Sequence, residues 1–292
     1  LIHFAEQPSA PFSMESLRKA LVTQQNNVQG TLVVIHAMHE LVPESHLLKL
    51  GTMGEYGTPN IDIEEGSIKI NHNGRSDTLP FPKLPGSFYH ASKVHDSTNL
   101  HLACRVWNLR VTDLNQGVVY GIDTNETALH PDLRTSFHYD AIFGTVLNRF
   151  CVQAVAGVPL TIYGTGGQTR AYLDIRDTLQ CLELAMKNPA NPGEFRVRNQ
   201  FTEVFSVLEL ANMVKLAAKE CGIKVEYGFI EENPRVEAEN HYYNPKNDSF
   251  RDLKLKPNPL TVNKLKTMIE KIKKDKHLID PEIIPPKVKW NK

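Results

Sequence analysis

The sequence predicts an α/β fold: a doubly wound parallel sheet with helices on both faces, followed by a smaller α/β lobe. Short apolar runs alternate with amphipathic stretches along the chain, which is typical of parallel strands connected by helices that cover the sheet. Polar and glycine-rich segments follow several of these runs, and open α/β sheets bind their ligands at such strand ends. The 292 residues suffice for one large α/β domain or for one domain with a smaller lobe.

The first half of the chain supplies most of the predicted sheet. We expect a strand at Leu1–Ala5, a mostly helical segment from Pro11 to His39, strands at 47–52 and 110–116, and a helix from about Phe88 to Trp107. Apolar residues in the first helical segment recur at spacings of three and four, as on one face of a helix.

Shorter elements fill the rest of the chain. Residues 58–85 are rich in Gly, Pro and Asn and contain the alternating run Ile68-Lys69-Ile70, so we expect a loop with a hairpin. Further helices are expected at 139–156, 178–186, 206–221 and 264–276, and strands at 160–164, 171–174, 194–197 and 225–230. These patterns place a domain boundary at residues 138/139, with domains 1–138 and 139–292.

Composition excludes several classes of protein. The 33 basic and 33 acidic residues cancel, so net charge indicates neither a nucleic-acid partner nor a membrane surface. The four cysteines match neither a zinc motif nor a disulfide framework, and we expect no metal site. No apolar run approaches the ~18 residues of a membrane span. A signal peptide pattern is also absent from the sequence.

The sharpest chemical signal is the segment from Tyr89 to Lys93, in the predicted helix 88–107. Residues four apart share a helix face, so these two side chains would project side by side. A nearby ammonium favours the phenolate of a tyrosine and lowers its pKa. The pair therefore suits removal of a hydroxyl proton while hydride leaves the same carbon. Taken alone, this spacing is weak evidence for a catalytic pair. Tyr242 and Lys246 have the same spacing, but Pro245 makes their segment unsuitable for a helix.

Two other predicted strand ends carry polar groups. Gly51-Thr52-Met53-Gly54-Glu55 follows the strand 47–52, and Thr52 offers a hydroxyl while Glu55 offers a carboxylate for a second proton transfer. His3 to Gln7 follows the first strand. Asn26 and Asn27 lie in a helical segment, where asparagine is disfavoured, which suggests a function for the amide; a buried amide bonded to a neighbouring group explains it equally well.

A glycine-rich run, Gly164 to Asp174, contains Arg170, and Arg235 lies further along the chain. The glycines lack the spacing of a dinucleotide fingerprint, and a strand-like rather than helical sequence follows them. Each arginine is a candidate diphosphate ligand, because the planar guanidinium matches phosphate oxygens. A surface ion pair is the alternative for each.

Together these segments resemble the extended short-chain dehydrogenase/reductase family that acts on sugar nucleotides, and more closely its UDP-sulfoquinovose synthase branch. The Thr52-Met53-Gly54-Glu55 run carries the closer resemblance, because most relatives have an acid pair directly after the threonine. The resemblance implies a Rossmann-like domain at 1–138 that binds NAD, and a lobe at 139–292 that binds mainly the UDP-sugar. It also implies a homodimer and, as substrates, UDP-glucose and sulfite.

The resemblance also implies residue roles. Catalytic residues would be Tyr89, Lys93, Thr52, Glu55 and His90, with Glu55 and His90 as an acid/base pair for loss of water across C5 and C6 after oxidation at C4. Cofactor-binding residues would be His3, Phe4, Ala5, Glu6, Asn26, Asn27, Gly51, Tyr89, Lys93, Gln116 and Val119. Substrate-binding residues would be Thr52, Tyr89, Asn115, Gln116, Asn148, Arg149, Arg170, Tyr172, Arg235 and Glu237.

The sequence departs from the family in two places. Pro8 stands where the family has an arginine near the sugar and the incoming anion, and proline supplies neither charge nor donor. The first residue is Leu1, within a predicted strand, and the family's first three β-α units are absent, roughly 90 residues at about 30 per unit. Those units hold the glycine loop for the cofactor pyrophosphate, so we expect this chain alone to bind NAD weakly and to form an incomplete sheet.

Three functions remain open at this point. One is sulfite addition to a UDP-sugar, and another is a different epimerase or dehydratase reaction of the same family. The third is an inactive fragment or remnant without the cofactor loop. The source of sulfite is also open, either a partner protein or free solution. A photosynthetic eukaryotic source would imply the plastid stroma, and a bacterial source would imply the cytoplasm.

Overall fold

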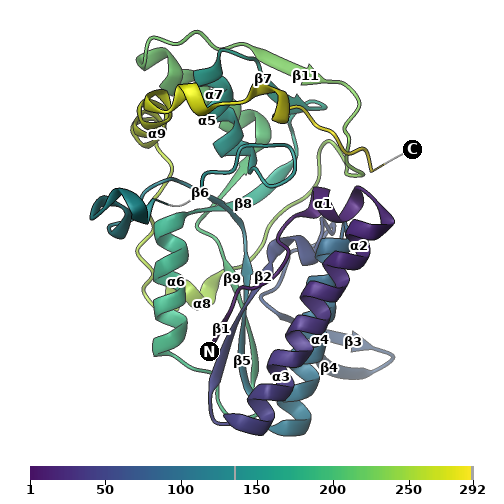
Figure 1. Cartoon of the computed structure of the whole chain (residues 1–292). Coiled ribbons are helices and arrows are strands. Elements are labelled where there is room, and N and C mark those ends of the chain that lie inside the picture. The colour runs from purple at the N-terminus through teal and green to yellow at the C-terminus, as the bar shows by residue number, and fades with distance from the viewer. Residues whose placement is uncertain (135, 291–292) are drawn as a thin grey trace. The chain divides into compact units, whose positions relative to one another are not determined.

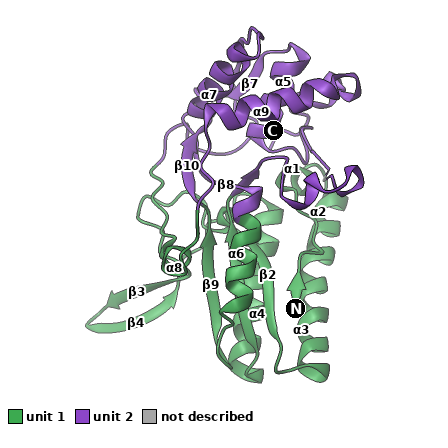
Figure 2. Cartoon of the chain, turned by 90° about the vertical axis from the view of Figure 1, so that its left-hand side faces the viewer, with its two compact units in different colours: residues 1–117, 178–201, 242–256 green, residues 118–177, 202–241, 257–292 purple. Residues whose placement is uncertain are grey.

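The computed structural model describes residues 1–134 and 136–290, which form two compact units (Figure 2). Unit 1 comprises Leu1–Gly117, Thr178–Phe201 and Tyr242–Lys256. Unit 2 comprises Val118–Asp177, Thr202–His241 and Pro257–Lys292, of which 291 and 292 lie outside the described residues. Because the chain passes back and forth between the units, a single boundary at 138/139 does not describe them: residues 118–138 belong to unit 2.

A parallel sheet forms the centre of unit 1 (Figure 1). Its strands are β1 (Ile2–His3), β2 (His46–Thr52), β5 (Arg110–Gln116) and β9 (Phe195–Gln200), in the order β1-β2-β5-β9. In the register, Gly51 pairs with Asn115, and Asn115 pairs with Asn199. The carboxyl ends of the strands therefore meet at one edge of the sheet, where the predicted polar segments begin.

Helices cover both faces of this sheet, which confirms the doubly wound α/β prediction. On one face, α3 (Gly30–Leu41) and α4 (Phe88–Trp107) pack against strand residues such as Leu47. On the other face, α6 (Ile175–Lys187) and α8 (Asp248–Asp252) pack against Leu48. Neighbouring leucines thus enter opposite cores, as the two-residue period of a strand requires.

The predicted helical segment 11–39 is not one helix. It consists of α1 (Ala10–Met14), α2 (Leu17–Gln24), the π-helical turn η1 (Gln25–Gln29) and α3. The side chain of Ser16 accepts a hydrogen bond from the Lys19 N–H and so starts α2 as its N-cap. The π turn inserts a bulge that directs Asn27 inward.

The predicted hairpin is confirmed. Strands β3 (Ser67–His72) and β4 (Arg75–Pro80) pair antiparallel around Asn73-Gly74, which both have positive φ as in a two-residue hairpin turn. The 3-10 turn η2 (Met53–Glu55) follows β2 and carries the Thr52–Glu55 segment.

Unit 2 packs three helices against short strands. The helices are α5 (Val146–Ala156), α7 (Val207–Glu220) and α9 (Val262–Lys274). The strands are β6 (Val118–Tyr120), β8 (Thr169–Asp174) and β10 (Glu203–Ser206) in one sheet, and β7 (Leu160–Tyr163) with β11 (Tyr227–Ile230) in another. Single 3-10 turns complete the described elements: η3 (Glu126–Ala128), η4 (Pro131–Leu133), η5 (Lys276–Leu278) and η6 (Pro281–Ile283).

The helix predicted at 139–156 begins only at Val146. The preceding turn is held by the buried Arg149, whose guanidinium donates to the backbone carbonyls of Tyr139, Asp140 and Gly144 at 2.9–3.3 Å. Among the described residues, no helix is both long and apolar enough to cross a membrane.

Candidate active site

Tyr89 and Lys93 lie on the first turns of α4, as predicted. The side chain of Ser87 accepts a hydrogen bond from the His90 N–H and starts this helix. Lys93 Nζ lies 5.7 Å from the centroid of the Tyr89 ring, and Thr52 is one of the groups that lower the pKa of Tyr89 against the effect of burial. The backbone N–H of Tyr89 donates to Ser13 Oγ at 2.9 Å, which fixes the start of α4 against α1.

The protein environment alone does not ionise Tyr89. Burial raises the pKa of Tyr89 to about 12, against the opposing effect of the Lys49 ammonium. Burial also lowers the pKa of Lys93 to about 8, although Asp96 and Asp113 counteract it. Formation of the phenolate therefore needs further positive charge at the site.

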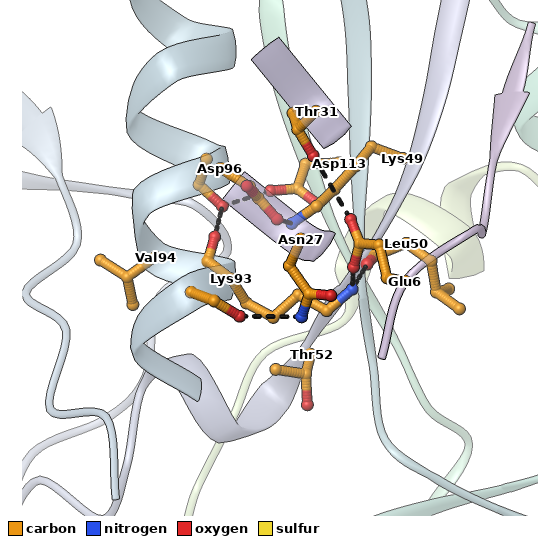
Figure 3. A network of polar contacts seen from close by, with 12 residues as sticks. Glu6, Asn27, Thr31, Lys49, Leu50, Thr52, Lys93, Val94, Asp96 and Asp113 are labelled. Atoms are coloured by element: carbon orange, nitrogen blue, oxygen red, sulfur yellow. Dashed lines mark hydrogen bonds and ion pairs between the residues drawn. The ribbon is translucent and has the colours of Figure 1, made fainter. Parts of the chain in front are cut away.

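Lys93 is held at the ends of β1 and β2 (Figure 3). Its Nζ donates to the Leu50 carbonyl at 2.6 Å and forms an ion pair with Glu6, which follows β1. Thr31 Oγ1 donates to Glu6 Oε1 at 3.5 Å, and His3 Nε2 lies 3.7 Å from the same oxygen. Two of the predicted cofactor residues, His3 and Glu6, are thus brought together with Lys93.

Asn27 connects three segments of unit 1. Its Oδ1 accepts from the Gln7 N–H at 2.8 Å, while its Nδ2 donates to the Gln7 carbonyl at 3.1 Å and to Ser92 Oγ at 2.9 Å. Asn26 Nδ2 donates to the same Oδ1 at 3.1 Å. These contacts match the alternative in which a buried amide bonds to neighbouring groups.

The Glu55 side chain is buried. Its Oε1 accepts from the Thr52 N–H at 3.3 Å, as part of a capping box that closes η2. Its Oε2 lies 3.1 Å from both Ser97 Oγ and Lys83 Nζ. Glu55 is therefore held by its own turn, by α4 and by the loop after β4.

Gly51 and Gly54 have no Cβ, which leaves room for the neighbouring side chains to approach this turn closely. A Cβ on Gly51 would lie 2.4 Å from Asn115 Oδ1 and 2.6 Å from Asp113 Oδ1. A Cβ on Gly54 would lie 2.4 Å from His90 Nε2. The predicted acid/base residue His90 thus lies directly against the Thr52–Glu55 turn.

Sequence reasoning missed a buried charged network behind Tyr89 and Lys93. It comprises Lys49 on β2, Asp113 on β5, and Asp96 and Ser97 on α4, all buried. Ser97 Oγ donates to Asp113 Oδ2 at 2.5 Å. Burial opposes ionisation of Lys49, but Asp113, Glu55 and Asp96 outweigh it and raise the pKa of the ammonium. A lysine between two leucines of a buried strand was the available signal.

The remaining predicted residues of unit 1 are placed as follows. Asn115 is buried, and its Nδ2 donates to the Tyr56 hydroxyl at 2.9 Å. Gln116 Nε2 donates to Gln200 Oε1 at 2.9 Å. Phe4 and Ala5 lie exposed after β1.

Unit 2 holds the other predicted residues. Arg170 forms an ion pair with Glu237 and donates through Nη1 to the Thr169 carbonyl at 2.8 Å. The guanidinium carbon of Arg235 lies 5.4 Å from the Trp290 ring centroid. Arg149 is occupied by the backbone carbonyls described above. Within unit 2, Arg170 is thus paired with Glu237, and the charge of Arg235 acts on Arg149.

Three more predicted residues belong to unit 2. Tyr172 is buried in the hydrophobic core, and Val119 is half-buried on β6. Asn148 Oδ1 is a buried acceptor with no hydrogen-bond partner in the described part of the chain. Within 1–134 and 136–290, no three His, Cys, Asp or Glu side chains are grouped so as to hold a metal ion.

Comparison with curated proteins gives close relatives. The chain is 58% identical to a chloroplastic UDP-sulfoquinovose synthase of Spinacia oleracea, over 100% of this chain and 60% of that protein. It is 45% identical to a UDP-sulfoquinovose synthase of Sulfolobus acidocaldarius, over 100% of this chain and 75% of that protein. The chain thus spans about three fifths of the spinach relative.

Solved structures show the same fold. The chain superimposes on a UDP-glucose 4-epimerase of Thermotoga maritima with a TM-score of 0.70 and 18% identity, covering 94% of this chain and 77% of that one. A UDP-glucuronic acid 4-epimerase of Bacillus cereus gives a TM-score of 0.68 and 19% identity, with 94% and 75% covered. A family model described as NAD dependent epimerase/dehydratase family matches residues 1–199. The fold, the family model and the full-length relatives agree, and the chain belongs to the NAD dependent epimerase/dehydratase family.

Proposed function

We propose that this chain is the catalytic part of an enzyme that converts UDP-glucose and sulfite into UDP-sulfoquinovose, with NAD as cofactor. The observation that carries the proposal is the position of Lys93 Nζ, 5.7 Å from the centroid of the Tyr89 ring on the same helix. The similarity to the spinach and Sulfolobus UDP-sulfoquinovose synthases supports the choice of reaction.

Tyr89 is the proposed base for oxidation at C4 of the glucose. Thr52, which lies close enough to lower the pKa of Tyr89, is the proposed second partner of the same substrate hydroxyl. Lys93 stabilises the phenolate electrostatically, and proton transfer by such a positioned group contributes about 10²–10⁴ in rate. Because burial raises the pKa of Tyr89 to about 12, the positive charge of an oxidised nicotinamide ring is an expected part of this activation.

The residues at the ends of β1 and β2 fit the nicotinamide end of NAD. Lys93 offers an ammonium beside Leu50, and Gln7 Nε2 is a buried donor with no hydrogen-bond partner among the described residues. When bound, NAD supplies hydride acceptance and return. Together with His3, Glu6 and Gly51, these groups would position the ribose and ring; Phe4, Ala5, Asn26, Asn27, Gln116 and Val119 remain further proposed cofactor contacts.

Glu55 and His90 are the proposed acid/base pair for the next step. The C4 ketone makes the C5 proton acidic, so a base and an acid can remove water across C5 and C6. Both residues lie at the Thr52–Glu55 turn, Glu55 within it and His90 against Gly54. Sulfite then adds at C6 and forms a carbon–sulfur bond.

Further residues are proposed to contact the substrate, and each is described within its own unit. Asn115 and Gln116 belong to unit 1, and Asn148, Arg149, Arg170, Tyr172, Arg235 and Glu237 belong to unit 2. A guanidinium suits the diphosphate. Arg170 would have to exchange Glu237 for that anion, and Asn148 Oδ1, which has no hydrogen-bond partner among the described residues, would accept from a uridine or sugar donor.

Incubation of the natural full-length protein with UDP-glucose, NAD and sulfite tests the proposal. A sulfonated UDP-sugar is expected by mass spectrometry, and Tyr89→Phe should lower its formation about 10²–10⁴-fold. A dehydrated or epimerised UDP-sugar formed equally with and without sulfite would favour the alternative, another epimerase or dehydratase reaction. No conversion by wild type would favour the inactive-fragment alternative.

Further proposals concern assembly and location. A homodimer is supported by apolar side chains exposed on α3 and α4, among them Val33, Leu102 and Val106. Light scattering during size-exclusion chromatography tests it, and a monomer mass would contradict it. A sulfite-donating partner protein stays a proposal, as does location in the plastid stroma for a photosynthetic eukaryotic source or the cytoplasm for a bacterial one.

A further inference from the structure

Lys83 places an ammonium group directly on the Glu55 carboxylate. Its Nζ lies 3.1 Å from Glu55 Oε2 and 4.0 Å from the centroid of the Tyr56 ring. The loop that carries it is fixed to the same turn, because the Leu84 N–H donates to the Glu55 carbonyl at 3.1 Å. A Cβ on Gly57 would lie 2.3 Å from the Leu84 carbonyl oxygen, so the two segments are in close contact.

Lys83 differs from the two other ammonium groups around this turn. Lys49 is completely enclosed. Lys93 donates to the Leu50 carbonyl and pairs with Glu6, and only 4% of its side chain is exposed. Lys83 has 16% of its side chain exposed and Glu55 as its ion-pair partner. Of the three, it is the ammonium that a small anion from solvent can reach.

The charge of Lys83 depends on the state of Glu55. While Glu55 is ionised, the carboxylate neutralises the ammonium at hydrogen-bonding distance, and the pair offers little attraction to another anion. Once Glu55 holds a proton, Lys83 keeps its charge without a counter-ion in a partly desolvated position. An unpaired charge in such a position is costly, so an incoming anion is favoured.

We propose that Lys83 binds the anionic sulfur nucleophile, and that proton uptake by Glu55 makes Lys83 available for it. This inference rests on the proposed function. In the elimination step the C5–H bond breaks and its proton passes to the Glu55 carboxylate, while the C6–O bond breaks and the oxygen leaves as water with a proton from His90. The electron pair of the C5–H bond becomes the C5–C6 double bond.

Addition reverses the charge movement at Glu55, while His90 regains its proton from bulk water. The lone pair on sulfur of the sulfite forms the C6–S bond, and the electrons of the double bond return to C5, which recovers the proton from Glu55. Glu55 is then an anion again and pairs with Lys83, which releases the sulfonate. Binding of sulfite is therefore coupled to the moment at which C6 can accept it.

The first test compares Lys83→Met with Lys83→Arg in the natural full-length protein, with Lys69→Met as control. Lys69 is an exposed lysine on β3 of the hairpin. We expect Lys83→Met to raise the KM for sulfite about ten- to a hundredfold, the loss of one charge-assisted contact. The KM for UDP-glucose should stay near wild type. Lys83→Arg and Lys69→Met should behave as wild type.

An unchanged KM for sulfite in Lys83→Met would overturn the inference. So would an equal rise in the KM for UDP-glucose, which would indicate a structural effect on the turn. If wild type exchanges the C5 proton but forms no sulfonated product, the proposed function fails instead, and the second test decides about Lys83.

The second test uses Glu55→Gln and needs no turnover. Removal of the carboxylate charge leaves Lys83 unpaired, so calorimetry should detect tighter binding of sulfite than in wild type, in the presence of NAD and UDP-glucose. The double variant Glu55→Gln/Lys83→Met should lose this gain. Sulfite binding by Glu55→Gln that is no tighter than wild type, or a gain that survives in the double variant, would contradict the role of Lys83.

Discussion

Lys49 and Asp113 face each other across neighbouring strands: they are register partners on β2 and β5, and Lys49 Nζ lies 3.7 Å from Asp113 Oδ1. Asp96 on α4 approaches the same ammonium at 3.8 Å. At most 1% of each of the three side chains is exposed to solvent. One ammonium group thus lies near two buried carboxylates. Burial raises the pKa of Asp96 to about 6, although the charges of Lys49 and Lys93 lower it.

Asp96→Asn should change how stability depends on pH. The pKa of Asp96 is about 6 in the folded protein and 3.8 as the ordinary value, so between these values the folded state binds more protons than the unfolded state. Stability contributed by this group is therefore present below pH 4 and is lost as pH rises through 6, by roughly 3 kcal/mol. The Asp96→Asn variant should not show this loss of stability.

Denaturant unfolding of wild type and Asp96→Asn between pH 4 and pH 7 measures this difference. The free energy of unfolding of wild type should fall relative to that of the variant across this range. Asp77→Asn, at an exposed position on β4, is the control. Its free energy of unfolding should depend on pH in the same way as that of wild type. Parallel curves for Asp96→Asn would show that Asp96 is ionised over the whole range.

The sequence predicted the local structure around the candidate site. Tyr89 and Lys93 lie four apart on one helix, and Thr52 lies at the end of a strand, as periodicity and fold class predict, while their catalytic roles stay proposals. The same reasoning gave the parallel sheet and the hairpin. These features follow from periodicity and turn chemistry, which a single sequence displays directly.

Features that depend on distant partners were not predictable in this way. The apolar pattern shows that the strand around Lys49 is buried, but its carboxylate partners come from β5 and α4, far along the chain. The π turn at Asn27 follows from bonds to Gln7 and Ser92, which a helical spacing pattern does not contain. The compact units could not be read from the sequence for a similar reason, since residues 178–201 return to unit 1.

Gly51→Ala should destabilise the protein. The added Cβ would lie 2.4 Å from Asn115 Oδ1 and 2.6 Å from Asp113 Oδ1, and both side chains are buried and hydrogen-bonded. Forcing them apart should cost about 1–3 kcal/mol. Gly30→Ala is the matched control, because nothing lies within 4 Å of its Cβ and its backbone is helical. It should stabilise by about 0.5–1 kcal/mol.

Thermal and denaturant unfolding of both variants compare these effects directly. Destabilisation by Gly51→Ala together with stabilisation by Gly30→Ala is the expected outcome. Equal stability of Gly51→Ala and wild type would mean that Asn115 and Asp113 can move aside without loss, and that the network around Lys49 is looser than the structure indicates.

Lys93 should lose its proton near pH 8. Burial lowers the pKa of its ammonium to about 8, while the carboxylates of Asp96 and Asp113 raise it. Asp96→Asn removes one of these negative charges, so the pKa of Lys93 should fall further. Titration of isotope-labelled lysine side chains by NMR measures this in the absence of cofactor, with Asp77→Asn again as the control.

The same titration predicts a limit to activity. If charged Lys93 supports the Tyr89 phenolate, kcat/KM should decline above about pH 8, and the decline should begin at lower pH in Asp96→Asn. A Lys93 that titrates near 10.5, its ordinary value, would contradict both statements.

Asn27→Ala should destabilise the connection between the β1 end and α4. The amide accepts from the Gln7 N–H and donates to the Gln7 carbonyl and to Ser92 Oγ, and the side chain is fully buried. Its removal leaves buried backbone groups without partners, each costing about 1–3 kcal/mol. Asn26→Ala, which removes only the bond to Asn27, should change the free energy of unfolding by less than about 1 kcal/mol.

Hydrogen exchange of the Gln7 amide separates a local from a global effect: it should accelerate in Asn27→Ala and stay slow in Asn26→Ala. Slow exchange in both variants would mean that the π turn holds the β1 end without the help of this amide.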